Sequence, residues 1–256
     1  MNADQNNDCA CLITGASSGI GKETVLFFLR NGYKVIGLAR NKIELMKIKD
    51  DWTDNFEYLC KDISEEQLIF EEIYKEMHGI HDIDLIVHAA GCARQGKPFH
   101  EMDQLDIMEQ IKTNIIGTTL FIQNAIKYFI SKGKGTLIVI SSIAAHDSAP
   151  NMAVYSATKS YLSHLLRSIR SDIHGLNIRI CCIEPGTTRT ALLEGQSTNN
   201  NENRYSGFLP LEAKDLAETI HWIYKSPYHI NFQGIQITPL SQTMYVRGIH
   251  RSNVEL

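Results

Sequence analysis

Short apolar segments alternate with longer segments of helical periodicity along nearly the whole chain, and this alternation is the strongest constraint on its fold. The segments 85–87 and 137–140 are apolar at every position, as expected for strands that are buried on both faces. Strands are expected at 9–13, 34–39, 57–60, 84–88, 136–140, 177–183 and 234–238, and helices at 22–31, 42–49, 65–78, 104–131, 153–174 and 212–224. Strand–helix–strand units form right-handed crossovers, so the pattern predicts an α/β fold with a doubly wound parallel sheet covered by helices on both faces.

The length and composition place few demands on domain organisation. Residues 1–8 lack the basic start and apolar stretch of a signal peptide, so we expect a flexible leader followed by a single domain over 9–256. No apolar run reaches the roughly 18 residues that span a membrane. The net charge is −4 and no basic stripe occurs, which argues against a nucleic-acid partner. A cytoplasmic protein is therefore expected.

The cysteines and one polar segment give two further expectations. The six cysteines form no C-x-x-C pair and no zinc-like spacing, so we expect buried, reduced thiols and no metal site. The segment 194–207 contains three consecutive asparagines and too few apolar residues to pack a core, so it is predicted to be a loop.

A glycine-rich turn follows the first expected strand. Residues 14–21 read Thr-Gly-Ala-Ser-Ser-Gly-Ile-Gly and lead directly into a helix. Glycines permit a tight turn there, and the backbone amides of a helix N-terminus bind a pyrophosphate. The residues expected to contact a dinucleotide are Gly15, Ser17, Ser18, Gly19, Ile20 and Gly21.

The end of the second expected strand distinguishes the two nicotinamide dinucleotides. An NAD site places an acidic residue here for the ribose 2′-hydroxyl, whereas an NADP site places an arginine. Residues 38–41 contain no Asp or Glu, and Arg40 is placed to meet a 2′-phosphate. The sequence therefore predicts NADP(H).

Three side chains form a candidate catalytic group. Tyr155 and Lys159 lie four residues apart and share one helix face, and Ser142 ends a buried strand at the edge of the sheet where ligands bind. A free tyrosine has a pKa near ~10, and a neighbouring ammonium together with the nicotinamide charge would lower it. The serine would hydrogen-bond a substrate carbonyl oxygen and hold it near the tyrosine, so Ser142 and Tyr155 are also the expected substrate contacts.

Together these motifs resemble the short-chain dehydrogenase/reductase family. Residues 14–21, Ser142, Tyr155-x-x-x-Lys159 and Pro185-Gly186-x-x-x-Thr190 follow that family's order and spacing over about 9–238. The resemblance implies a Rossmann-type fold with a seven-stranded parallel sheet. It also implies hydride transfer between a carbonyl and an alcohol by an NADP(H)-dependent oxidoreductase.

The same resemblance implies roles for other residues. Asn114 would be the fourth catalytic residue, supporting a water that relays protons to Lys159, and Asp62 with Ile63 would contact the adenine. Further cofactor contacts implied by the resemblance are Tyr155, Lys159, Ala89, Ala90, Gly91, Pro185, Gly186, Thr188 and Thr190.

One motif departs from the family. Where the family usually has Asn-Asn-Ala-Gly after the fourth strand, this chain reads His88-Ala89-Ala90-Gly91. By resemblance, the replaced asparagines stabilise the central sheet and approach the cofactor ribose. The departure therefore predicts altered cofactor affinity rather than loss of activity.

The C-terminal half is similar to one branch of the family, the bacterial NADP-dependent 3-hydroxy-acid (serine and allo-threonine) dehydrogenases and malonic semialdehyde reductases. A small polar 3-hydroxy acid or semialdehyde is therefore the expected substrate, with Arg189 or Arg94 as the candidate partner of a carboxylate. Two alternatives remain: a broad carbonyl, steroid or acyl-chain ketone reductase, and a non-catalytic NADP(H)-sensing module.

The helices 104–131 and 153–174 carry more apolar residues than one narrow stripe. These residues include Ile111, Ile115, Leu120, Leu162, Leu165 and Leu166. Surplus apolar surface predicts a partner, and the resemblance implies a homo-oligomer, either a dimer or a homotetramer. Burial within one subunit is the alternative explanation.

Overall fold

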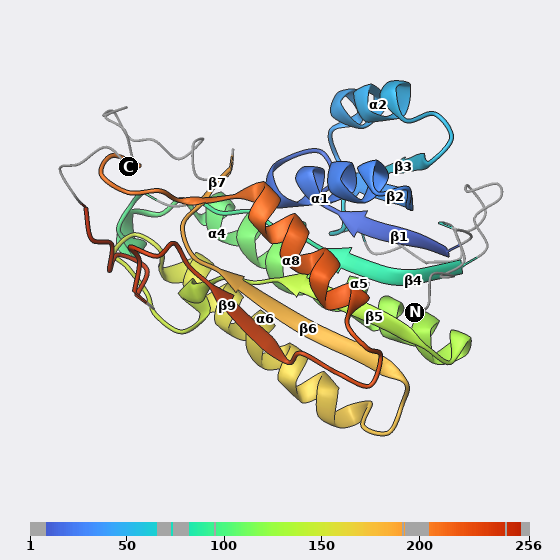
Figure 1. The fold of residues 1–256 in the computed structure, drawn as a ribbon. Coiled ribbons are helices and arrows are strands. Elements are labelled where there is room, and N and C mark those ends of the chain that lie inside the picture. The colour runs from blue at the N-terminus through green and yellow to red at the C-terminus, as the bar shows by residue number, and fades with distance from the viewer. Residues whose placement is uncertain are drawn as a thin grey trace.

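The central element of the fold is a sheet of seven strands in the order β3-β2-β1-β4-β5-β6-β9, and every neighbouring pair is parallel (Figure 1). The computed structural model describes residues 9–65, 73, 82–94, 96–190, 192, 205–243 and 245–251. The strands are β1 (Cys9–Thr14), β2 (Lys34–Ala39), β3 (Phe56–Cys60), β4 (Asp82–His88), β5 (Gly135–Ile140), β6 (Ile178–Pro185) and β9 (Gly234–Ile237).

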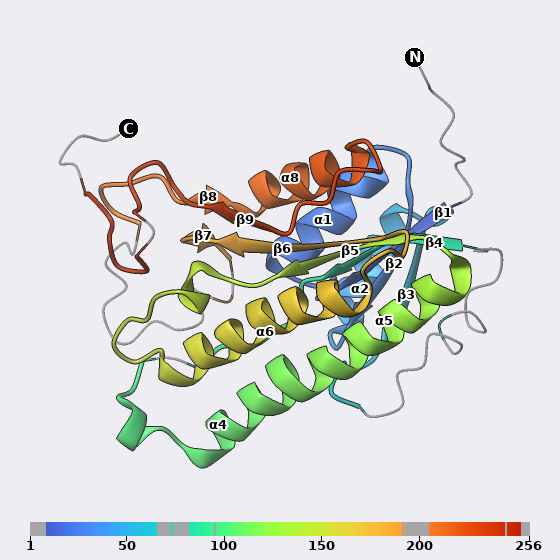
Figure 2. The ribbon, with the colours of Figure 1, turned by 90° about the horizontal axis from the view of Figure 1, so that it is seen from below.

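Helices lie on both faces of this sheet (Figure 2). One face carries α1 (Gly19–Arg30), α2 (Lys42–Asp51) and α8 (Ala213–Lys225). The other carries α4 (Gln104–Ile111), α5 (Thr118–Lys132) and α6 (Ala153–Asp172), with a π-helical segment, η2 (Lys112–Gly117), between α4 and α5. The predicted doubly wound parallel fold is confirmed.

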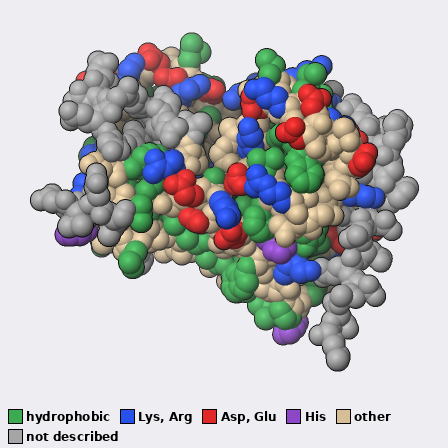
Figure 3. All heavy atoms as spheres, turned by 45° about the horizontal axis from the view of Figure 1, so that its top comes forward, with side chains coloured by type: hydrophobic (Ala, Val, Ile, Leu, Met, Phe, Trp, Pro, Cys, Tyr) green, Lys and Arg blue, Asp and Glu red, His purple; other side chains and the backbone are tan. Residues whose placement is uncertain are grey.

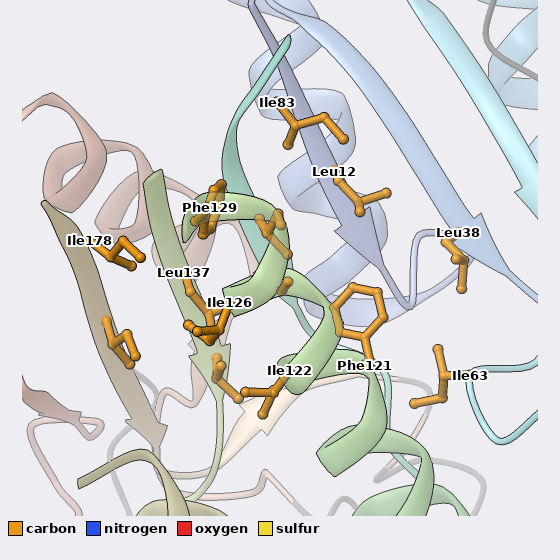
Figure 4. Packing of buried hydrophobic residues seen from close by; sticks show 14 of the residues in the cluster. Leu12, Leu38, Ile63, Ile83, Phe121, Ile122, Ile126, Phe129, Leu137 and Ile178 are labelled. Atoms are coloured by element: carbon orange, nitrogen blue, oxygen red, sulfur yellow. The ribbon is translucent and has the colours of Figure 1, made fainter. Parts of the chain in front are cut away.

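Alternation along each strand builds two hydrophobic cores. Leu12 and Ile13 are adjacent in β1 and fully buried, yet Leu12 packs toward α5 and α6 whereas Ile13 packs toward α1 and α8. Leu137 and Ile138 divide in the same way in β5. Figure 4 shows the first of these cores, in which Phe121, Ile122, Ile126 and Phe129 of α5 lie against the sheet. Burial on both faces explains why these strands are apolar throughout.

Several boundaries and elements differ from the expectations. The helix expected over 104–131 is interrupted by η2, and two short paired strands, β7 (Thr188–Arg189) and β8 (Leu211–Glu212), were not anticipated. Most of the helix expected at 65–78 and of the loop expected at 194–207 lies outside the described residues. The expectation of buried thiols is wrong for Cys60, which is exposed because β3 is an edge strand, whereas Cys11, Cys92, Cys181 and Cys182 are buried.

The strand order places a ligand-binding crevice beside β1. The chain proceeds from β1 outward to β2 and β3 on one side, and from β4 outward to β5 and β6 on the other. Ligands of open α/β sheets bind at such a reversal, beyond the carboxyl ends of the strands. The arrowheads in Figure 1 point to that edge, and the C-terminal segment lies beyond it. Within the described residues, no helix is long and apolar enough to cross a membrane.

Candidate functional site

A pocket of about 210 Å³ opens at this edge of the sheet. The loops after β1, β4, β5 and β6 contribute to it, together with the start of α6 and the C-terminal segment. Its lining includes Gly15, Ser18, Gly19, Ile20, Ala89, Ala90, Gly91, Ser142, Tyr155, Lys159, Pro185, Gly186, Thr188 and Thr190. Most of the predicted site residues therefore meet in one place, although they come from four strand ends.

The glycine-rich turn is shaped by backbone contacts that a side chain would block. Gly15 has a φ of +70°, and a Cβ there would lie 2.9 Å from the backbone of Ala89. A Cβ on Gly21 would lie only 2.3 Å from the carbonyl oxygen of Gly15. Gly19, with a φ of +51°, opens α1. The glycines thus bring the first turn of α1 close to the loop after β4, as a dinucleotide pyrophosphate requires.

The N-terminus of α1 retains donors for an anion. Its N-cap residue, Ser18, makes no side-chain capping hydrogen bond, and the first turn contains no acidic residue. The first amides of a helix have no partner within the helix, and the helix dipole adds a partial positive charge. This donor set fits a pyrophosphate. Ser17 is half-buried in the same turn, and Gly21 lies within α1; neither lines the pocket itself.

Arg40 and Asp62 meet at the ends of β2 and β3. The Arg40 guanidinium lies 3.4 Å from a carboxylate oxygen of Asp62, and the arginine side chain is 60% exposed. Asp62 also accepts a hydrogen bond of 2.9 Å from the amide of Ser64, and these contacts lower its pKa although burial opposes the change. Ile63 is buried in the core against α5, as Figure 4 shows, so only its backbone is available to a nucleotide. Asp62 thus orients the Arg40 side chain, and the guanidinium remains accessible to a ligand.

Ser142, Tyr155 and Lys159 converge on the opposite side of the pocket. The Ser142 hydroxyl accepts a hydrogen bond of 3.1 Å from the amide of Ala144 and so caps η3 (Ile143–Ala145). The Lys159 ammonium lies 5.7 Å from the centroid of the Tyr155 ring and donates a 3.1 Å hydrogen bond to the carbonyl oxygen of Ile140. Both side chains project from the first turns of α6, so the helix fixes their separation.

Burial controls the protonation of this pair. It raises the pKa of Tyr155 above its usual value, and the hydrogen bond with Ser142 only partly offsets that rise. Burial also lowers the pKa of Lys159 to about 8. In the protein alone the pKa of Tyr155 is thus raised, and its lowering by Lys159 together with the nicotinamide charge stays a prediction. Lys159 is buried and Tyr155 is half-buried, and desolvation disfavours the charged form of each. Tyr155 is a neutral phenol here and can donate a proton.

Asn114 lies at the centre of the π-helical segment η2. Its side-chain amide donates 2.8 Å and 3.1 Å hydrogen bonds to the Cys92 carbonyl and the Thr158 hydroxyl, and its oxygen accepts from the Cys92 amide at 2.8 Å. In a regular α-helix, the amide of Thr118 would bond to the Asn114 carbonyl, but here it bonds to the carbonyls of Thr113 and Ile115. The wide turn therefore releases the Asn114 carbonyl from its regular partner.

The departure at His88 has a structural explanation. The imidazole is buried and joins two hydroxyl groups: Nδ1 lies 3.0 Å from Thr14 Oγ1, and Nε2 lies 3.0 Å from Thr118 Oγ1. The ring also stacks on Phe121, with centroids 5.0 Å apart. The Thr14 hydroxyl further accepts hydrogen bonds from the amides of Ala89 and Ala90. His88 thus links β1, β4 and α5, and its contacts are those of a structural residue.

The loop after β6 faces the glycine-rich turn. Thr188 is buried and donates from its hydroxyl to the carbonyl oxygen of Gly186 at 3.0 Å. A Cβ on Gly19 would lie 3.4 Å from the Cγ2 atom of Thr190, so this loop closes the pocket over the start of α1. Pro185, at the end of β6, and Gly186, which follows it, also line the pocket.

The two arginines expected near a substrate carboxylate are engaged elsewhere. Arg189 pairs with Glu212 at 2.9 Å and lies over the ring of Tyr205, while Arg94 forms a two-point pair with Glu109. Neither lines the pocket. Among the described residues that do, Lys159 is the only cationic side chain. Basic and acidic side chains also lie next to one another on the face shown in Figure 3.

The pocket includes residues that the sequence did not single out. Met152, Leu192, Gln242 and Val246 also line it. They belong to no motif and come from three separate segments, with Gln242 and Val246 in the same one, so only the fold brings them together. The resemblance of the C-terminal half to one branch of the family was the one available signal.

Comparison with known proteins agrees with the fold. A family profile described as "short chain dehydrogenase" matches residues 10–201. Serine 3-dehydrogenase of Rhizobium radiobacter is 33% identical over 245 residues, 94% of this chain and 98% of that protein. NADP-dependent 3-hydroxy acid dehydrogenase YdfG of Escherichia coli (strain K12) is 27% identical over 249 residues, again 94% of this chain and 98% of that protein. A closed form of serine dehydrogenase complexed with NADP+ superposes with a TM-score of 0.86 at 27% identity, covering 91% of this chain and 96% of that one. The chain belongs to the short-chain dehydrogenase family.

Proposed function

We propose that the protein is an NADP(H)-dependent oxidoreductase that interconverts a carbonyl group and an alcohol on a small 3-hydroxy acid or its semialdehyde. The observation that carries this proposal is the convergence of Ser142, Tyr155 and Lys159 on one pocket with the glycine-rich turn at Gly15. A nucleotide site and a proton donor thus face the same space.

The described residues fit a phosphorylated dinucleotide. The uncapped start of α1 offers amides to the pyrophosphate, and Arg40 offers an exposed guanidinium at the end of β2. Gly15 lets the glycine-rich turn pack against the backbone of Ala89, where a Cβ would collide. The remaining proposed contacts are Ser17, Ser18, Gly19, Ile20, Gly21, Asp62, the Ile63 backbone, Ala89, Ala90, Gly91, Pro185, Gly186, Thr188 and Thr190. When bound, the nucleotide supplies the hydride and, in its oxidised form, a positive charge beside Tyr155.

The side chains of the pocket perform the acid–base part of the reaction. Ser142 donates a hydrogen bond to the carbonyl oxygen and orients it, and Tyr155, a neutral phenol whose pKa is raised further by desolvation, donates a proton to that oxygen. Lys159, which donates to the Ile140 carbonyl within the pocket, would bind the nicotinamide ribose and resupply the proton. The Asn114 carbonyl, released from its helical partner by the π turn, would accept a hydrogen bond from a water that relays protons to Lys159.

The substrate class rests on the relatives. Serine 3-dehydrogenase and the NADP-dependent 3-hydroxy acid dehydrogenase YdfG align with nearly the full chain, which supports a small hydroxy acid. The lining of the pocket favours a second candidate, a neutral ketone, because Ile143, Met152, Leu192 and Val246 are apolar. The described pocket residues include no arginine for a carboxylate.

The test is turnover with a substrate panel. NADPH absorbance would be followed with malonic semialdehyde and with neutral ketones, and NADP+ reduction with serine-like and other 3-hydroxy acids. We expect turnover of the acids, and a preference for NADPH over NADH. Turnover of neutral ketones alone would support the second candidate, a ketone reductase. NADPH binding without any turnover would instead support a nucleotide-sensing module.

We also propose that the protein is a homo-oligomer. Apolar side chains are exposed along the outer side of α4, η2 and α5, namely Leu105, Met108, Ile116, Leu120 and Ile130. Such a row is more apolar than a monomer surface usually is. Leu162 and Leu166 do not contribute, because they are buried in the core of the subunit. Light scattering during size-exclusion chromatography tests this, and a monomer at micromolar concentration would contradict it.

A further inference from the structure

The C-terminal segment contributes Gln242 and Val246 to the lining of the pocket and is held by the first of these, a buried glutamine. Gln242 is only 6% exposed, although both adjoining described residues are more accessible. Around it the chain turns back on itself: Gln242 and Ile249 form an antiparallel bridge, and the Thr243 amide donates to the Gly248 carbonyl at 2.7 Å. We call 242–249, of which residue 244 is not described, the C-terminal hairpin.

The carboxamide oxygen of Gln242 contacts the nucleotide side of the pocket. It accepts a 2.8 Å hydrogen bond from the amide of Thr187, in the loop after β6. It also lies so close to Gly186 that a Cβ there would come within 2.6 Å. The Gln242 carboxamide oxygen therefore stabilises the loop after β6, which faces the glycine-rich turn.

The carboxamide nitrogen of Gln242 contacts the hairpin. It donates to the carbonyl oxygen of Val246 at 3.1 Å and to that of Tyr245 at 3.4 Å. Only this orientation of the amide satisfies all three partners, because one partner is a donor and two are acceptors. Each end of the side chain thus has a distinct role.

Val246 is held from its other side as well. Its amide donates a 3.1 Å hydrogen bond to a carboxylate oxygen of Asp147, five residues after Ser142. The neighbouring Arg247 donates to the Pro150 carbonyl at 3.1 Å. Val246 lines the pocket, so one pocket residue is fixed between the loop after β6 and the loop after Ser142.

We propose that Gln242 is a positioning residue that couples the nucleotide-side loop at Thr187 to the substrate-side wall at Val246, and that this clamp sets how closely the wall packs against the substrate. The proposal rests on the proposed function for its kinetic consequences. The clamp itself consists of contacts within the chain. A merely structural glutamine would affect stability without separating nucleotide binding from substrate binding.

The test variant is Gln242→Glu. A glutamate keeps an oxygen that accepts from the Thr187 amide, but it replaces the donor to Val246 and Tyr245 by a second oxygen that repels their carbonyls. We expect the KM for the carbonyl substrate to rise about tenfold, the usual scale for a buried group left without its partner. The NADPH dissociation constant, measured by fluorescence, should change less than about threefold. Gln233→Glu, an exposed position, is the matched control for the added charge.

A second readout uses pH. When the new carboxyl group is protonated it can again donate one hydrogen bond. A free glutamate has a pKa near ~4.3, and burial beside two carbonyl oxygens raises it, so the ratio of variant to wild-type kcat/KM should recover as the pH falls from about 8 to about 4.5. The ratio for Gln233→Glu should stay constant. A neutral-pH defect without this recovery would mean that the lost donor is not the cause.

Limited proteolysis tests the clamp without enzyme turnover, and substitutions at Asp147 test it from the loop after Ser142. Trypsin should cut after Arg247 several times faster in Gln242→Glu than in the wild type. Asp147→Leu should also be cut faster by trypsin and should also have a higher KM. Asp147→Asn still accepts from the Val246 amide, so its cleavage rate and KM should be those of the wild type. If the wild type reduces no carbonyl, the proposed function fails, but the cleavage rates still decide the clamp. Unchanged cleavage and an unchanged KM in Gln242→Glu and Asp147→Leu would overturn it.

Discussion

The Nδ1 atom of His88 lies 3.0 Å from the hydroxyl oxygen of Thr14, and the neighbouring contacts determine the direction of this hydrogen bond. Thr14 Oγ1 already accepts from the Ala89 and Ala90 amides, so its own proton points to the imidazole. On the other side, the Thr118 hydroxyl donates to the Thr113 carbonyl and accepts from His88 Nε2. The bridge therefore requires a neutral imidazole with its proton on Nε2, since protonated Nδ1 would face the Thr14 proton.

This arrangement predicts a pH dependence of stability. Burial, with a smaller contribution from the nearby Lys159, lowers the pKa of His88 from 6.5 to about 3. Between those values the unfolded chain binds one more proton than the folded chain. The stabilisation is complete above pH 6.5 and declines as the pH falls, by about 1.4 kcal/mol per pH unit. Urea unfolding of the wild type between about pH 7 and pH 4 measures this slope.

His88→Asn separates this contribution from other titrating groups. The shorter side chain cannot span Thr14 and Thr118, so we expect the free energy of unfolding at pH 7 to fall by about 1–3 kcal/mol. The difference between wild type and variant should then shrink as the pH is lowered. His100→Asn, at an exposed histidine, provides the control. A difference that does not change with pH would contradict a neutral His88.

Arg40 is predicted to select the phosphorylated nucleotide. Arg40→Ala removes a charge-assisted hydrogen bond to the 2′-phosphate, worth about 1.5–3 kcal/mol, so the dissociation constant of NADPH should rise roughly 10–100-fold. That of NADH should change less than about threefold. Fluorescence titration measures both constants. Arg30→Ala is the control, because Arg30 is an exposed arginine paired with Glu23. Equal weakening of both nucleotides would contradict this assignment.

We predict that deprotonation of Lys159 lowers the rate of carbonyl reduction at high pH. Its pKa, lowered by burial to about 8, means that the ammonium is present below that pH and lost above it. Because only the charged form resupplies a proton, kcat/KM should decline above about pH 8, well before a free lysine would deprotonate. Initial rates across pH, corrected for stability, show this decline. A profile that stays flat to about pH 10 would refute this role.

Much of the fold was predictable because its causes are local. Uniformly apolar strands and intervening helices specify a buried parallel sheet, and the glycines near Gly15 mark its first turn. The edge position of β3 is set by strand order, which no local pattern encodes, so the exposure of Cys60 was not predictable. Helical periodicity also does not distinguish one π turn from an α turn, so the turn around Asn114 escaped notice.

The parts of the site that were not predicted depend on long-range contacts. Thr14 and Thr118 are 74 and 30 positions from His88, so the sequence showed a lost asparagine but not the bridge that replaces it. Arg189 follows the Pro185–Gly186 turn and was expected near a substrate. Pairing of β7 with β8 instead places it opposite Glu212. Such partners become visible only once the chain is folded.

The most direct test of the account is Tyr155→Phe, assayed for NADPH binding and for carbonyl reduction in the same preparation. The substitution removes the hydroxyl that donates the proton and keeps the ring. We predict that kcat falls about 10²–10⁴-fold while the NADPH dissociation constant stays within about threefold of the wild type. Retention of more than about a tenth of wild-type turnover would contradict the role of Tyr155 and the reaction assigned to this pocket.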